Sequence, residues 1–132
     1  MEQKSRRIRV VIADDSRTAL YSVCKFLEFS GQFEIVGTAF DGVLLLRLVE
    51  RFKPDLVLAD VSMPRMNGFE AAARLRKSNP GLRIVMFSGL DGLSLRDECM
   101  RSGADAFVPK IHMPEQLLQE IVQLFPDAQS VE

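Results

Sequence analysis

Four short apolar segments of this sequence end in polar side chains that could do chemistry together. These side chains are Asp14, Asp15, Asp60, Ser88 and Lys110. If the segment ends meet, three carboxylates lie together, and each charged pair at about 6 Å costs roughly 3 kcal/mol at an effective dielectric constant of about 20. A divalent cation would relieve that repulsion. Oxygen ligands without a nearby histidine or cysteine suit Mg²⁺, which takes one or two carboxylates and a phosphate.

The other two side chains of this group supply a cation and a hydrogen-bond donor. The ammonium group of Lys110 and the hydroxyl of Ser88 suit the oxygens of a phosphoryl group. The five side chains therefore predict a site for a carboxylate, a metal ion and a phosphoryl group. Asp60 alone is more typical of a helix cap or a turn. The prediction thus depends on a fold that brings the segment ends together.

The elements that must position these side chains alternate along the chain. Five short segments are rich in β-branched or continuous apolar residues, as is typical of buried strands: 8–13, 33–38, 55–60, 83–87 and 106–108. Each is followed by a segment with apolar residues at helical spacing. Glycine or proline marks the limits of these helices, at Gly31, Pro54, Pro80, Gly103 and Pro114.

Five alternations of strand and helix with short connections predict an α/β fold with helices on both faces of a parallel sheet. Right-handed crossovers leave few strand orders, and we expect a flavodoxin-like, doubly wound, five-stranded parallel sheet with order 2-1-3-4-5 in a single domain. In this order the carboxyl ends of strands one, three, four and five are neighbours. Ligands bind at that edge of such sheets.

Composition agrees with one globular domain. The chain has 132 residues, 47% hydrophobic and 27% charged, and we expect the domain to span 8–126 between a flexible N-terminal tail, 1–7, and a C-terminal tail, 127–132. A net charge of −1 argues against direct nucleic-acid binding. No apolar stretch has the length of a membrane span or a signal-peptide core, so a cytoplasmic location is expected.

The motifs at the segment ends resemble those of a two-component response-regulator receiver domain, over nearly the full length of the chain. Each motif alone is weakly specific, but together they occur in the right order, each at the end of the appropriate strand. The residues that carry the resemblance are Asp14-Asp15, Asp60-Val61-Ser62-Met63-Pro64 with Arg65-Met66-Asn67-Gly68, Ser88-Gly89, Gly103-Ala104-Asp105 and Lys110.

The resemblance implies a role for each acidic residue. Asp60 is expected to accept a phosphoryl group from the phosphohistidine of a sensor histidine kinase or a phosphotransfer protein. Asp15 and Asp60 are expected to bind Mg²⁺ directly, with the backbone carbonyl of Ser62 as the third protein ligand and Asp14 assisting. The resemblance therefore implies a phosphoacceptor that assists its own phosphorylation and dephosphorylation, not an enzyme that turns over a foreign substrate.

The resemblance also implies how the signal leaves the site. Lys110 would pair with the phosphoryl group, Ser88 would donate its hydroxyl to it, and Phe107 would fill the aromatic switch position. The output surface is expected around residues 88–125, where a downstream effector domain or protein binds, with a homodimer on phosphorylation as a further option.

The sequence departs from the family pattern at four positions. Gly89 and Ala106 are conservative departures from the alanine and glycine that are common there. Phe107 lacks the hydroxyl of the commoner tyrosine, so switching there must work through packing. Ile111 follows Lys110 where many members have proline. Because a cis bond without proline costs about 3–4 kcal/mol, we expect a trans Lys110–Ile111 bond.

Three other functions compete with this interpretation. An interaction module could keep the fold without depending on phosphorylation, but all five site residues are present. A flavodoxin-like cofactor protein needs a phosphate loop after the first strand, where Asp14-Asp15 would repel a phosphate. An aspartyl-phosphate phosphatase usually has a second acid two residues after its nucleophile, and position 62 is serine.

Overall fold

The structure is a computed structural model that describes residues 6–129. Residues 1–5 and 130–132 of the two expected tails lie outside the described residues. At the N-terminal end of the described chain, Arg6 lies 3.5 Å from the carboxylate of Asp55. At the other end, Pro126–Gln129 form a short 3-10 helix.

A five-stranded parallel sheet with the order β2-β1-β3-β4-β5 is the centre of the fold. This arrangement confirms the expected doubly wound α/β fold and its strand order. The strands are β1 (Ile8–Ala13), β2 (Phe33–Ala39), β3 (Leu56–Asp60), β4 (Arg83–Ser88) and β5 (Ala106–Pro109).

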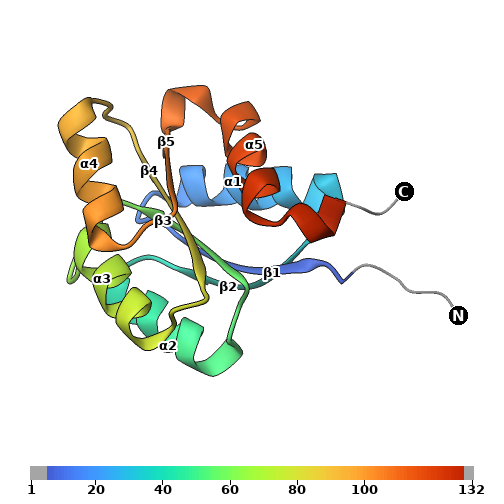
Figure 1. The fold of residues 1–132 in the computed structure, drawn as a ribbon, viewed down its shortest axis with the longest axis horizontal. Helices are drawn as coiled ribbons and strands as arrows, with labels where there is room; N and C mark the ends of the chain where they lie inside the picture. Colours follow the sequence, from blue (N-terminus) through green and yellow to red (C-terminus); the bar gives the residue numbers. More distant parts are fainter. Residues whose placement is uncertain (1–5, 130–132) are drawn as a thin grey trace, which may run out of the picture.

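Helices cover both faces of the sheet (Figure 1). They are α1 (Arg17–Ser30), α2 (Gly42–Phe52), α3 (Gly68–Ser78), α4 (Leu93–Ser102) and α5 (Glu115–Leu124). One apolar core lies between the sheet and α2, α3 and α4, and a second lies between the sheet and α1 and α5. β3 contributes to both cores, and all five of its residues are buried.

Side-chain caps start three of the helices directly after the strand ends. Ser16, Asp41 and Asn67 each accept a hydrogen bond from the backbone N–H three residues further on. Such caps satisfy N–H groups that have no partner within the helix. They therefore fix the short loops that carry the polar residues at the carboxyl edge of the sheet.

The connection between β5 and α5 differs from the sequence expectation. Lys110–His112 form a 3-10 turn, η1, that the residue pattern did not indicate. The only cis peptide bond among the described residues is Met113–Pro114, so the trans Lys110–Ile111 bond is confirmed. None of the helices within residues 6–129 has the length and apolar character to cross a membrane.

Close backbone approach at Gly68 holds α3 against the end of β3. The Gly68 N–H donates to the Val61 carbonyl over 2.7 Å. A β-carbon at position 68 would clash with the backbone oxygen of Asp60 and lie 2.9 Å from the α-carbon of Val61. Only glycine therefore lets the first residue of α3 pack against the strand end that carries Asp60.

We expect Gly68→Ala to lower the free energy of unfolding by about 1–3 kcal/mol, because the added methyl group meets backbone that cannot move aside. Gly81→Ala is the matched control, since nothing lies within 4 Å of a β-carbon there, and it should change stability by less than about 0.5 kcal/mol. Urea denaturation of both variants measures the difference. Equal effects of the two substitutions would contradict the close-packing argument.

Candidate functional site

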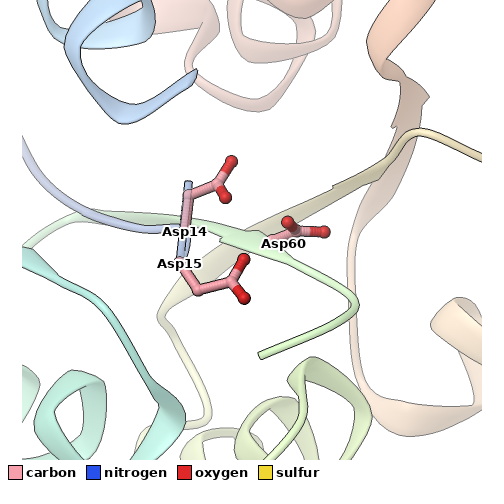
Figure 2. A group of neighbouring side chains, drawn as sticks. All are labelled: Asp14, Asp15 and Asp60. Atoms are coloured by element: carbon pink, nitrogen blue, oxygen red, sulfur yellow. The ribbon is translucent and has the colours of Figure 1, made fainter. Parts of the chain in front are cut away.

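Three carboxylates gather at the carboxyl edge of the sheet. Asp14 and Asp15 follow the last residue of β1, and Asp60 ends the neighbouring strand β3 (Figure 2). One carboxylate oxygen from each residue lies within 4.8 Å of those of the other two. The parallel register of β1 and β3 produces this grouping, since Ala13 pairs with Ala59 immediately before the acids.

The three acids have different surroundings. Asp14 and Asp60 are buried, whereas Asp15 is exposed. The backbone N–H of Ser16 donates to Asp14 Oδ1 over 2.9 Å, and that of Ser62 donates to Asp60 Oδ1 over 3.2 Å. Each buried carboxylate is thus oriented by the backbone two residues further along the chain.

Lys110 places its ammonium group between the two buried acids. Its Nζ lies 2.9 Å from Asp14 Oδ2 and 3.1 Å from Asp60 Oδ2. The same nitrogen lies 5.4 Å from the ring centroid of Phe87, the residue of β4 that pairs with Asp60. The structure therefore joins Lys110 to the acids, as the sequence predicts.

Burial and charge shift the protonation equilibria of this group. Burial, followed by the negative charge of Asp14, raises the pKa of Asp60 to about 6, although Ser62 and Lys110 oppose the shift. Burial by itself lowers the pKa of Lys110, but the contacts with Asp14 and Asp60 outweigh it, and the pKa is raised. Lys110 therefore stays charged, while ionisation of Asp60 is opposed first by its burial and then by repulsion from Asp14.

The carboxylates fit a divalent cation. Asp14 Oδ2 is buried and accepts no hydrogen bond of good geometry, and Lys110 is its ionic partner. One ammonium group contacts two of the three clustered carboxylates, so negative charge remains in excess. Oxygen ligands with unsatisfied charge suit Mg²⁺. Ser62, whose backbone carbonyl is a predicted ligand, follows Asp60 in the same loop, with its side chain exposed.

Ser88 ends the neighbouring strand β4 and is buried. The residue before it, Phe87, pairs with Asp60 across the sheet, so the serine lies on the same edge as the acids. Its hydroxyl oxygen accepts a hydrogen bond from the N–H of Leu90 over 3.0 Å. Because an accepting hydroxyl still has its hydrogen, Ser88 can donate to a further oxygen.

Phe107, the predicted switch residue, is buried in the neighbouring strand β5. It belongs to β5, pairs with Met86 of β4 and is only 4% exposed. The guanidinium group of Arg96, from α4, lies 5.2 Å from the centroid of its ring. The sequence did not indicate this contact, because Arg96 has no special spacing to any motif and only the packing of α4 on β5 brings it there.

The loop after β3 is joined to the start of α2 by a second contact that the sequence did not indicate. Arg65 Nε lies 3.4 Å from Asp41 Oδ2. Asp41 is the helix cap that the sequence predicts, and it also accepts a hydrogen bond from the backbone N–H of Leu44.

An apolar groove of about 300 Å³ lies between α1 and α5, and Lys110 of the site is one of the residues that line it.

Comparison with known proteins identifies related sequences and structures. The family model of the response regulator receiver domain matches residues 10–122. A protein-glutamate methylesterase/protein-glutamine glutaminase of Clostridium acetobutylicum is 34% identical over 113 residues, which cover 84% of this chain and 33% of that protein. Response regulator MprA of Mycobacterium leprae is 36% identical over 114 residues, covering 86% of this chain and 49% of that protein.

A solved structure, the CheX–CheY–BeF3–Mg complex of Borrelia burgdorferi, contains a chain with the same fold. It is 26% identical, has a TM-score of 0.85, and the match covers 91% of this chain and 90% of that one. The chain thus spans a third to a half of the length of the two curated relatives, but nearly all of this solved domain.

The raised pKa of Asp60 predicts a pH dependence of stability in chelator-treated protein. The pKa is about 6 in the folded state and 3.8 as the ordinary value, so folding favours the protonated acid. The free energy of unfolding should fall as pH rises from about 4 through about 6. Asp60→Asn, which does not titrate, should become more stable than the natural protein by a margin that grows by about 1–3 kcal/mol across this range.

Urea denaturation at several pH values with a chelator present measures this margin. Asp97→Asn, an exposed acid of α4, is the control and should show no such trend. A stability margin for Asp60→Asn that stays constant with pH would mean that folding does not raise the pKa of Asp60.

Proposed function

Because the chain belongs to the family of response regulator receiver domains, we propose that it is a cytoplasmic phosphoacceptor switch whose phosphorylated residue is Asp60. The donor would be the phosphohistidine of a sensor histidine kinase or of a phosphotransfer protein. The observation that carries the proposal is the position of Asp60, a buried carboxylate 3.1 Å from the Lys110 ammonium group and beside two further acids.

In the proposed reaction, a carboxylate oxygen of Asp60 forms a bond to phosphorus as the bond from phosphorus to the donor imidazole breaks. Lys110 is positioned to balance charge on the phosphoryl oxygens, and Ser88 to donate its hydroxyl to one of them. The backbone N–H of Ser62, which donates to Asp60 Oδ1, orients the carboxylate. In a separate step, water attacks the phosphorus as its bond to the Asp60 oxygen breaks, which releases inorganic phosphate and returns the free carboxylate.

Mg²⁺ is the proposed cofactor. Asp15 and Asp60 would hold it directly, with the backbone carbonyl of Ser62 as third ligand and Asp14 assisting. When bound, the ion supplies positive charge that offsets the carboxylates and the phosphoryl oxygens. Support comes from the three carboxylates within 4.8 Å and from the buried Asp14 Oδ2, whose ionic partner is the Lys110 ammonium group.

The proposed output is a change of surface around residues 88–125. Ser88 would move toward the phosphoryl group, and the adjustment would pass to Phe107 through β4 and β5, which pair with each other. A downstream effector domain or protein would recognise the altered surface, and a homodimer formed on phosphorylation is a further form of this output. Phe107 would act through packing, since it carries no hydroxyl.

Phosphorylation should occur at Asp60 and require the metal. With a small phosphodonor and Mg²⁺, the natural protein should gain one phosphoryl group, which intact-mass spectrometry detects. Asp60→Asn should gain none, and the exposed control Asp97→Asn should behave like the natural protein. Asp15→Asn should bind Mg²⁺ at least tenfold more weakly by calorimetric titration. Modification of Asp60→Asn at the natural rate would refute the assignment.

Binding of a phosphoryl mimic should change amide hydrogen exchange within residues 88–110. The reason is that Ser88, the loop after it and Phe107 connect the site to α4 and β5. The surface of α1 and α3 lies outside this route and is expected to stay nearly constant. Exchange measured with Mg²⁺, with and without beryllofluoride, tests this. Changes confined to α1 and α3, or none although the mimic binds, would exclude this route.

A further inference from the structure

Arg96 joins three elements that lie around the proposed switch. It lies in the first turn of α4, and its guanidinium group lies 5.2 Å from the Phe107 ring centroid on β5. Its Nε lies 3.4 Å from Asp91 Oδ1, in the loop between β4 and α4. One side chain of α4 therefore contacts both the aromatic residue of β5 and the loop that follows Ser88.

The loop between Ser88 and α4 has few other restraints. At its start, the Leu90 N–H donates to Ser88 Oγ. Residues 89–92 are all exposed, and nothing lies within 4 Å of a β-carbon built at Gly89 or Gly92. Gly92 has a φ of 152° and provides no side-chain cap for α4. Within the described chain, side chains outside the loop contact it at both ends, Ser88 at its start and Arg96 of α4 at its other end.

Phe107 depends on the same arginine for a polar contact. A tyrosine at this position could hold its place through a hydroxyl hydrogen bond, but phenylalanine has only its ring face and edge. The ring is buried, and the guanidinium group over it supplies a cation–π attraction. Arg96 therefore supplies a polar contact to a ring that has no hydroxyl of its own.

We infer that Arg96 is a positioning residue that clamps the loop 89–92 and Phe107 in the resting arrangement and so opposes the move to the phosphorylated one. If Ser88 is drawn toward a phosphoryl group on Asp60, the loop must follow, while Arg96 holds Asp91 toward α4. Release of this contact is then part of switching. The opposition to switching rests on the proposed function, whereas the two contacts of Arg96 are present in the structure whatever the function is.

The first test uses the protein without metal or mimic. Arg96→Met keeps most of the side-chain length but removes both contacts, and it should speed amide exchange of residues 90–96 about threefold to tenfold, the range for losing one exposed ion pair and one cation–π contact. Arg96→Lys, which keeps the charge near Asp91, should restore part of the protection. Arg101→Met, an exposed arginine of the same helix, is the control. Unchanged exchange in Arg96→Met overturns the clamp.

The second test measures the affinity for beryllofluoride with Mg²⁺ by calorimetry. Arg96→Met should bind it about threefold to tenfold more tightly than the natural protein, and Asp91→Asn should show part of this gain. A residue that only stabilised the fold would leave the affinity unchanged or weaken it when removed, and either result overturns the inference.

Failure of the phosphoacceptor proposal can be distinguished from failure of the inference about Arg96. If the natural protein does not bind the mimic, the phosphoacceptor proposal fails, and the opposition to switching fails with it. The exchange measurement then still decides whether Arg96 clamps the loop.

Discussion

The contact of the Lys110 ammonium group with two buried carboxylates is the interaction on which the site depends. Asp14 and Asp60 stand at neighbouring strand ends and are almost fully buried, so two like charges there without a counterion would be costly. Nζ of Lys110 lies about 3 Å from both. This one cation permits the two acids to share an edge, yet it leaves the group with excess negative charge. Burial and, after it, the charge of Asp14 raise the pKa of Asp60, and the excess charge underlies the affinity that we propose for a metal ion.

The sheet delivers these groups to one place through register. β1, β3, β4 and β5 are consecutive neighbours, so the residues just past their ends converge. Close approach of α3 at Gly68 holds the end of β3, and the caps at Ser16 and Asp41 hold the loops after β1 and β2. The site is therefore built on buried strands and capped helices, which keep its geometry constant.

The loop after β4, at the same edge of the sheet, is less restrained than the loops that carry the acids. After β4 the chain passes through exposed residues with two glycines, and few contacts restrain it. The acids are held by strands, whereas the neighbouring loop is weakly restrained. A change of charge at the acids can therefore be expressed as movement of the loop. Arg96 matters because it is a link of modest strength between that loop and a buried aromatic ring.

Fold class and the five polar residues at the strand ends were predictable from the residues, because hydrophobic periodicity and turn residues are local properties. The strand order was predictable because right-handed crossovers leave few alternatives. It also indicated the cap at Asp41, since capping involves residues three positions apart. The 3-10 turn at Lys110–His112, the Arg65–Asp41 pair and the position of Arg96 over Phe107 were not indicated. These features emerge from the packing of separate elements, because each involves long side chains or loop backbone whose positions no local pattern specifies.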